Sequence, residues 1–368
     1  FVGSNPAVGL GNPGNTAICN SNTLTFPVSS TATNPPGTIY TVTFNDGTPP
    51  SSFPHPAPAN ISHTFLLTSC GTTSPGYPNS FSATIQASNP CNSSTATVVP
   101  IYVSQKPVAA FSIAPNDTIC VNSTATFTNT SGDANEIDNG TCIPGKFIWT
   151  VTPSTGWTVA SGTLGNDFNL ADPSTWLSGS TSLSLNFTTT GTYSIKLKLG
   201  NLTCGADSIT KTICVNPLPT GSFSVNQNTG CAPLTVNTTS SSNASLCGTN
   251  RYAWSVQYAP TTGCTPSVSN FIYLGGTNSA SPQPQFQFIN PGIYTIEMVI
   301  IGPANACSSA VVTQIITVKG KPVVTLGPLP ASICINGSVS PSVSATCYPA
   351  TNSYAWTLAG GNPSSSTS

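Results

Sequence analysis

A short aromatic segment occurs three times in this chain and once more in weaker form. Its clearest copy is Arg-Tyr-Ala-Trp-Ser-Val at 251–256, and it returns as Lys-Phe-Ile-Trp-Thr-Val at 146–151, Ser-Tyr-Ala-Trp-Thr-Leu at 353–358 and Ile-Tyr-Thr-Val-Thr-Phe at 39–44. Large apolar residues alternate with small or polar ones, which is the period-2 pattern of a half-buried β-strand. We therefore expect each copy to be the central strand of one repeat, with Trp149, Trp254 and Trp356 in the cores.

Four prolines mark the joints between these repeats. Pro6, Pro107, Pro219 and Pro322 are 101, 112 and 103 residues apart, and each of the last three follows a β-rich run. The period is one domain long, and a proline stiffens a linker of about four residues. The expected organisation is a tail of a preceding repeat at 1–3, complete repeats at 4–106, 107–218 and 219–321, and the first half of a fourth at 322–368.

The order of strand and turn signals within a repeat predicts the fold. Seven or so short apolar runs are separated by Gly, Pro, Asn and Ser, and 38 % of the chain is apolar with a net charge of only −1. This composition provides a core and argues against disorder, although Gly and Pro are abundant. We predict an all-β protein of tandem immunoglobulin-like β-sandwiches.

Composition also excludes several kinds of partner and activity. Eight basic residues in 368 cannot form the positive surface of a nucleic-acid or anionic-lipid binder. No apolar run approaches the roughly 18 to 20 residues of a membrane span, so we expect no membrane insertion. The two histidines, His55 and His63, lie near no Gly-x-Ser-x-Gly nucleophile motif. We predict that the protein is not an enzyme.

Several short motifs resemble those of PKD-type immunoglobulin-like repeats. Phe-Asn-Asp-Gly at 44–47 is similar to the family's Phe-Gly-Asp-Gly turn, and His-Thr-Phe at 63–65 to its His-x-Tyr strand. The sequences Gly-Thr-Tyr at 191–193 and Gly-Ile-Tyr at 292–294 resemble its Gly-x-Tyr start of the penultimate strand. The second and third repeats lack the Asp-Gly turn and carry long insertions after the Trp strand.

Such repeats occur in very large surface adhesins of Bacteroidetes, including gliding-motility adhesins and other cargo of type IX secretion. The resemblance implies an extracellular protein at a bacterial cell surface. It also implies O-glycosylation, because Asp117-Thr118-Ile119 and Asp207-Ser208-Ile209 look like the Asp-Ser/Thr-aliphatic signal of that phylum. The expected acceptors are Thr118 and Ser208.

Thirteen cysteines without a Cys-x-x-Cys motif indicate disulfides formed in an oxidising compartment. Strand order places each cysteine at one end of its sandwich, and sulfurs at opposite ends are too far apart to bond. This predicts five bonds within repeats, namely Cys19–Cys70, Cys120–Cys214, Cys142–Cys204, Cys231–Cys264 and Cys247–Cys307. Cys91 is left unpaired, with burial the favoured environment and a cross-link the alternative. Cys334 and Cys347 are expected to find partners beyond Ser368.

One acidic cluster is a calcium candidate. Asp133, Glu136 and Asp138 alternate along a loop as oxygen ligands can, but the spacing is not that of an EF-hand loop and no closing Glu follows. A solvated loop is the favoured interpretation, and we expect no cofactor.

The predicted function is that of a non-enzymatic stalk of a cell-surface adhesin or filament. Its expected partners are further repeats of the same chain, with lateral self-assembly or contact with surface polysaccharide as additions. One alternative is a self-assembling extracellular fibre. Another is a set of carbohydrate-binding modules of a secreted hydrolase, for which Trp157 and Trp176 are the candidate exposed platforms.

Overall fold

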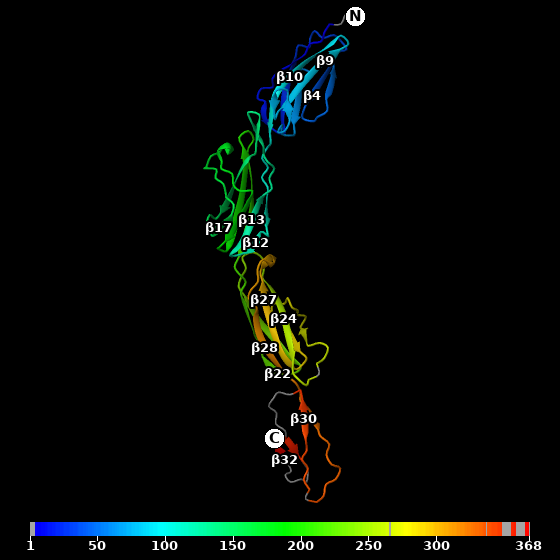
Figure 1. The fold of residues 1–368 in the computed structure, drawn as a ribbon, viewed down its shortest axis with the longest axis vertical. Coiled ribbons are helices and arrows are strands. Elements are labelled where there is room, and N and C mark those ends of the chain that lie inside the picture. Colours follow the sequence, from blue (N-terminus) through cyan, green and yellow to red (C-terminus); the bar gives the residue numbers. More distant parts are fainter. Residues whose placement is uncertain (1–3, 265, 336, 348–354, 358–364, 368) are drawn as a thin grey trace. The chain divides into compact units, whose positions relative to one another are not determined.

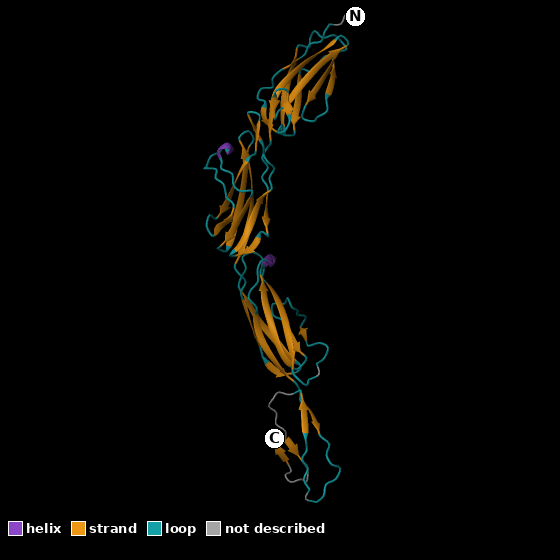
Figure 2. Ribbon diagram, in the orientation of Figure 1, coloured by secondary structure: helices purple, strands orange, loops and turns teal. Residues whose placement is uncertain are grey.

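The computed structural model describes residues 4–264, 266–335, 337–347, 355–357 and 365–367. Figure 2 shows that this part of the chain consists of strands and loops, with short helical turns. These turns are the 3-10 segments η1 (Pro173–Thr175) and η2 (Pro303–Asn305). The protein is therefore an all-β protein, as the alternation of apolar and polar residues predicts.

The first sandwich is made of two sheets. One sheet has the order β1 (Gly9–Leu10), β3 (Asn22–Ser29) and β6 (Asn60–Phe65). The other has the order β2 (Ala17–Cys19), β10 (Asn92–Ser104), β9 (Phe81–Asn89), β4 (Ile39–Phe44) and β5 (Ser51–Pro54). Buried side chains from both sheets, Phe26, Phe65, Tyr40, Ile85 and Val103 among them, form one core. A two-stranded ribbon, β7 (Thr73–Ser74) with β8 (Tyr77–Pro78), lies before β9.

The second sandwich repeats this arrangement with four strands in each sheet. Its first sheet is β11 (Phe111–Ala114), β13 (Ser123–Asn129), β18 (Ser182–Phe187) and β17 (Trp157–Ser161). Its second is β12 (Thr118–Cys120), β20 (Gly205–Asn216), β19 (Gly191–Asn201) and β16 (Lys146–Thr152). A separate hairpin pairs β14 (Glu136–Asp138) with β15 (Thr141–Ile143).

The third sandwich has the same strand order as the second. One sheet is β21 (Gly221–Val225), β23 (Leu234–Ser242), β26 (Gln285–Phe288) and β25 (Phe271–Leu274). The other is β22 (Thr229–Cys231), β28 (Val312–Lys319), β27 (Gly292–Ile301) and β24 (Arg251–Pro260). The described residues after it form two pairs, β29 (Val323–Leu326) with β30 (Val343–Thr346), and β31 (Ala355–Thr357) with β32 (Ser365–Thr367).

The recurring tryptophans lie where the two sheets of a sandwich meet. Trp149 is 3 % exposed and Trp254 is 5 % exposed. Each ring packs edge-on against a phenylalanine of the opposite sheet, and each indole N–H donates to a loop carbonyl at 2.9 Å. A buried tryptophan needs such an acceptor, because an unpaired indole N–H would cost free energy. Trp356, in β31, is half-buried.

Two tyrosines form the corner that is a hallmark of immunoglobulin-like sandwiches. The hydroxyl of Tyr193 donates to the carbonyl of Thr189 at 2.8 Å, and that of Tyr294 donates to the carbonyl of Asn290 at 2.9 Å. Both tyrosines start the penultimate strand and are buried. Burial raises the pKa of Tyr294 to about 12. The Gly-x-Tyr motif thus fixes the turn before this strand through a buried hydroxyl.

The chain divides into two compact units that do not coincide with the proline joints. One contains Phe1–Asp117 and Asn122–Ile213, and the other contains Thr118–Val121 and Cys214–Ser368. The boundary between the units therefore falls within β20, and β12 is grouped with the end of that strand and with the third sandwich. The boundaries predicted from the prolines remain a prediction.

Replacing Tyr294 by Phe tests the corner in the third sandwich. The substitution keeps the ring and leaves the Asn290 carbonyl without this donor, which should cost about 1 to 3 kcal/mol. Hydrogen exchange of the full chain should therefore become roughly 5- to 100-fold faster at the β27 amides. Tyr252→Phe is the control, because its hydroxyl lies on the surface near Ser242. Equal exchange in the two variants would contradict a stabilising role of the corner.

Candidate functional site

The described part of the chain contains five disulfides, and every one joins two different repeats. The pairs are Cys19–Cys204, Cys70–Cys142, Cys120–Cys307, Cys214–Cys247 and Cys264–Cys347, with Cα–Cα separations of 5.6, 5.8, 6.2, 6.4 and 4.4 Å. Two bonds lead from the first repeat to the second, two from the second to the third, and one from the third to the fourth. The joints between repeats are therefore the chemically distinctive regions of the molecule.

The pairing predicted from the sequence was wrong for all five bonds. The predicted bonds were Cys19–Cys70, Cys120–Cys214, Cys142–Cys204, Cys231–Cys264 and Cys247–Cys307. Each wrong pair combined two cysteines at the same end of one sandwich, such as Cys142 and Cys204. In the structure each of these two reaches the facing end of the neighbouring repeat instead. Strand length excludes bonds between opposite ends, but it cannot distinguish a same-end partner from one across the joint.

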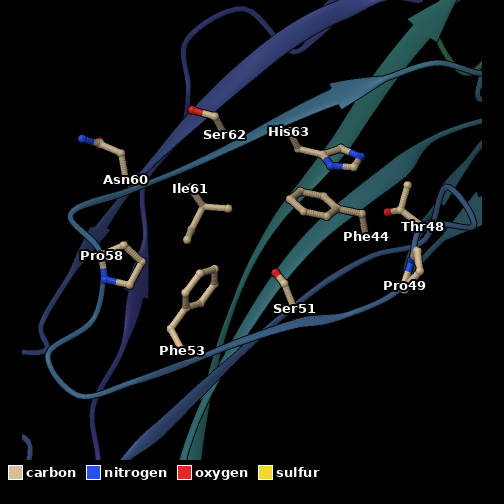
Figure 3. A pocket seen from close by; sticks show the side chains of 10 residues that line it. All are labelled: Phe44, Thr48, Pro49, Ser51, Phe53, Pro58, Asn60, Ile61, Ser62 and His63. Carbon is tan, nitrogen blue, oxygen red and sulfur yellow. The ribbon is translucent and has the colours of Figure 1, made fainter.

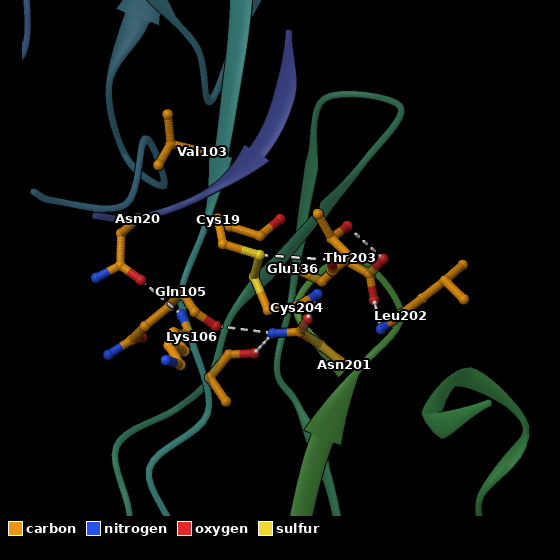
Figure 4. The surroundings of a disulfide bond; sticks show 12 residues. Cys19, Asn20, Val103, Gln105, Lys106, Glu136, Asn201, Leu202, Thr203 and Cys204 are labelled. Carbon is orange, nitrogen blue, oxygen red and sulfur yellow. Dashed lines mark hydrogen bonds between the residues drawn. A yellow bond between two sulfur atoms is a disulfide. The ribbon is translucent and has the colours of Figure 1, made fainter. Parts of the chain in front are cut away.

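The first joint is also held by hydrogen bonds from both repeats (Figure 4). The Asn201 side chain donates to the carbonyls of Gln105 and Ala134, both at 2.8 Å. The Lys106 amide donates to the Asn20 side chain at 2.7 Å. Each backbone group of the linker that is paired in this way loses freedom, because rotation would break the bond. The linker is thus clamped next to the Cys19–Cys204 bond.

Asn216, at the end of β20, has a similar role in the next joint. Its carbonyl oxygen accepts from the backbone amides of Leu246 and Cys247 at 2.9 and 3.0 Å, and from the Ser245 hydroxyl at 2.9 Å. These residues form the loop before the Trp strand of the third sandwich. One asparagine side chain therefore orders the loop that carries Cys247, the partner of Cys214.

The remaining cysteines required further corrections. Cys347, expected to bond beyond Ser368, bonds with Cys264. Cys231, expected to bond with Cys264, is free and exposed. Cys91 is free but exposed rather than buried, because it lies at the turn between β9 and β10. Cys334 is also free and exposed, and the structure does not test its expected partner.

A half-buried pair, His63 and Asp46, orders the turn after β4 in the first sandwich. His63 Nε2 and Asp46 Oδ2 are 2.6 Å apart, and the Thr48 amide and hydroxyl both donate to Asp46 Oδ1, at 3.1 and 2.6 Å. Phe44 stacks on the His63 ring with centroids 3.7 Å apart. Burial raises the pKa of Asp46, but the hydrogen bonds from His63 and Thr48 outweigh it and hold the pKa below its ordinary value. The pair has a structural role, because the two side chains hydrogen-bond to each other and Asp46 also accepts from Thr48 in the turn.

A small pocket lies beside this pair (Figure 3). It has a volume of about 320 Å³ and is lined by residues of β5, β6 and the turns next to them, Phe53, Ile61 and Asn60 among them. Strands β5 and β6 are edge strands of the two opposing sheets, so the pocket is the open side of the sandwich. His63 is the one titratable residue among the ten that line it, and it already pairs with Asp46. The pocket offers hydroxyl and amide groups for weak polar contacts.

The acidic cluster is used for local structure. Glu136 accepts from the Leu202 amide at 2.9 Å and from the Thr203 hydroxyl at 3.0 Å. Asp138 accepts from the Asn139 side chain at 3.0 Å. In the described part of the chain, no group of three acidic, His or Cys side chains, Asp133 included, converges as metal ligands. Glu136 instead ties β14 to the turn that carries Cys204.

The predicted aromatic platform is only partly exposed. Trp176 is 2 % exposed, which corrects the expectation of an exposed ring. Its indole N–H donates to the Leu170 carbonyl at 3.0 Å, and Lys198 Nζ lies 4.2 Å from its ring centroid. The insertion between β17 and β18 thus buries its own tryptophan. Trp157, in β17, is half-buried, so no pair of exposed tryptophans exists in the second repeat.

The two predicted glycosylation residues lie on strands of the same sheet. Thr118 starts β12 and is half-buried, opposite Cys214 on the parallel neighbour. Ser208 lies in β20 and is exposed. Glycosylation of either residue remains a prediction.

No protein-family model matches this sequence, and no curated protein matches it. Among solved structures, the chain is similar to the Escherichia coli adhesin FdeC, with 14 % identity over 87 % of this chain and all of that one, and a TM-score of 0.36. It is also similar to three N-terminal domains of the outer capsid protein Hoc of bacteriophage RB49, with 11 % identity, 86 % and 100 % coverage and a TM-score of 0.34. The Down syndrome cell adhesion molecule gives 12 % identity, 85 % and 36 % coverage and a TM-score of 0.40.

Among the described residues, no helix is long and apolar enough to span a membrane.

Acid should weaken the first sandwich through Asp46. A carboxyl group with a lowered folded pKa stabilises the fold above its unfolded pKa, and this contribution is lost as the pH falls through the folded pKa. The urea midpoint of the first sandwich, followed by the His63 ring signal in NMR spectra, should therefore fall as the pH drops below the ordinary aspartate pKa and through the lowered pKa of Asp46. Asp46→Asn should lower the midpoint at pH 7 and reduce this pH dependence. An unchanged pH dependence in the variant would show that other carboxyl groups cause it.

The first joint should loosen when its two disulfides are removed. Replacing Cys19, Cys204, Cys70 and Cys142 by Ser leaves only the hydrogen bonds, so exchange of the Gln105 and Lys106 amides should accelerate at least about tenfold. The measurement is hydrogen exchange with mass spectrometry on the full chain. Cys91→Ser is the matched control, because it removes an unbonded exposed thiol. If the linker exchanged at the same rate in both proteins, the disulfides would not be what holds it.

Proposed function

We propose that this chain is part of a non-enzymatic, load-bearing stalk of an extracellular adhesin or filament. The observation that carries the proposal is that the disulfides among the described residues join successive repeats. A bond within a sandwich would stabilise that sandwich alone. A bond across a joint limits how far two repeats can separate.

The shortest covalent path from residue 1 to residue 368 crosses three of the five bonds. It runs from residue 1 to Cys19, crosses to Cys204, continues to Cys214, crosses to Cys247, continues to Cys264, crosses to Cys347 and ends at residue 368. Only about 70 of the 368 residues lie on this path, because the other residues are in loops that the disulfides close. At about 3.4 Å per extended residue, this path reaches roughly 250 Å, whereas the reduced chain reaches roughly 1,250 Å.

This arrangement suits a protein under tension. The disulfides transmit the load between repeats. While they remain intact, unfolding of a sandwich can lengthen the chain only by the few residues that lie on the covalent path. Because disulfides form and persist in oxidising surroundings, the same bonds support an extracellular location. A surface with few charges also allows repeats to lie close to one another or to polysaccharide with little repulsion.

The more specific assignment follows the PKD-like motifs. We infer a cell-surface adhesin of Bacteroidetes, exported by type IX secretion and related to gliding-motility adhesins, with Thr118 and Ser208 as O-glycosylated residues. The Asp46–His63 pair supports this inference. It joins the turn and the strand of the first repeat that resemble the Phe-Gly-Asp-Gly and His-x-Tyr motifs of the family. Self-assembly into a fibre is the alternative function. It predicts that the purified protein forms regular polymers. The buried Trp176 weakens the carbohydrate-binding alternative.

Single-molecule stretching of the full chain by its termini tests the load-bearing role. Without reductant, we expect the contour length to stop near 250 Å, and with reductant to approach 1,250 Å. A Cys214→Ser and Cys247→Ser double variant should give an intermediate length, because it lengthens the covalent path and leaves the other joints bonded. An oxidised chain that extends to the full contour length would refute the proposal.

A further inference from the structure

The exposed thiol of Cys231 occupies a position whose equivalents are bonded. Cys19 ends β2 opposite Ser104, and Cys120 ends β12 opposite Asn216, each on a short strand parallel to the last strand of its sandwich. Cys231 ends β22 opposite Lys319 in the same register. We call these three the foot cysteines. Each faces the residue three positions before a joint proline, so the three sites present their sulfur at the same place relative to the linker.

Cys91 is likewise equivalent to bonded cysteines at the other end of a sandwich. Cys204 and Cys307 lie between the last two strands of the second and third sandwiches, and Cys91 lies between the last two strands of the first. We call these three the hairpin cysteines. In both complete joints, a foot cysteine bonds with the hairpin cysteine of the following repeat, as Cys19–Cys204 and Cys120–Cys307 show.

The surroundings of Cys91 also match those of Cys204. The Asn201 side chain accepts from the Cys204 amide at 2.7 Å and donates to Gln105, two residues before Pro107. The Asn89 side chain accepts from the Cys91 amide at 2.9 Å and donates to the Ser4 carbonyl at 3.0 Å, two residues before Pro6. The clamp that accompanies a bonded hairpin cysteine is therefore built around Cys91 as well.

The third joint lacks one of its two bonds. The first two joints each have a foot-to-hairpin bond and a second bond to the cysteine before the next Trp strand, Cys142 or Cys247. The third joint has the second kind, Cys264–Cys347, and leaves Cys231 free. The repeat that contains Cys347 is thus already bonded to the third sandwich. The same repeat follows the third one in the chain, so its hairpin cysteine is the expected partner of Cys231.

We propose that Cys91 and Cys231 are covalent docking sites for further immunoglobulin-like repeats of the same polypeptide. Cys91 bonds with the foot cysteine of a preceding repeat, and Cys231 bonds with the hairpin cysteine of the repeat that contains Cys347. In each case two thiols lose two protons and two electrons to form one disulfide. An oxidised dithiol oxidoreductase or a small disulfide takes them up and is reduced to two thiols. The inference rests on the proposed stalk and extends its ladder of bonds in both directions.

Disulfide mapping of the protein isolated from its source tests the proposal. Free thiols are blocked with N-ethylmaleimide before digestion, and peptides are assigned by mass spectrometry with and without reduction. We expect Cys91 and Cys231 to be unlabelled and bonded to cysteines elsewhere in the same polypeptide, so that reduction leaves the chain mass unchanged on a denaturing gel. Labelled thiols, or small-molecule caps on both, would overturn the proposal. A bond to a second copy, seen as a halved mass on reduction, would overturn the assignment to the same polypeptide.

The chain of residues 1–368 provides the matched control. Because the proposed partner cysteines lie outside it, a thiol titration of this chain without denaturant should count three thiols. Cys91→Ser and Cys231→Ser should each lower the count by one, and Cys204→Ser should raise it by one by freeing Cys19. A count of one, from a Cys91–Cys231 bond, would also overturn the proposal. The stretching experiment depends on the other bonds, so the stalk can stand if this proposal fails.

Discussion

A covalent bond across a joint is the constraint on which the rest of this molecule depends. Two sandwiches that are joined by a linker of about four residues share only a small interface. Domains with a small interface ordinarily move relative to each other. Here the bonds Cys19–Cys204 and Cys70–Cys142 connect the facing ends of two repeats. Two separate attachment points remove most rotations that one would allow. The hydrogen bonds of Asn201 and Asn20 then need only to fix the linker between them.

Because the disulfides lie at the joints, the interior of each sandwich is stabilised by other means. Trp149 and Trp254 fill the space between sheets, and the hydroxyls of Tyr193 and Tyr294 anchor the turn before the penultimate strand. Burial of these aromatic rings supplies the hydrophobic driving force, and their polar atoms are satisfied by loop carbonyls. Stability of a repeat and connection between repeats are thus carried by separate residues.

Much of the fold follows from local sequence. The alternating pattern around Trp254 predicts a half-buried central strand, and the order of strands assigns each cysteine to one end of a sandwich. The choice of partner does not follow, because two cysteines at one end, such as Cys142 and Cys204, satisfy the same distance limit as a pair across the joint. A signal was available in the counts, because strand order places two cysteines, Cys19 and Cys70, at one end of the first sandwich and two, Cys142 and Cys204, at one end of the second.

The insertions were less predictable than the strands. Trp176 lies in a long segment without periodicity, and its burial depends on the Leu170 carbonyl and Lys198, neither of which a local pattern identifies. The Asp46–His63 contact joins a turn to a strand 17 residues later, and only the resemblance to PKD-type motifs suggested that both residues matter. Contacts that depend on loop closure over many residues are set by the tertiary fold.

The most direct test of this account is to map the disulfides of residues 1–368 after peptic digestion at acidic pH, where thiol exchange is slow. The account predicts a peptide pair that contains Cys19 and Cys204 and another that contains Cys70 and Cys142. Recovery of Cys142 bonded to Cys204, with Cys19 bonded to Cys70, would place the bonds within repeats and contradict it.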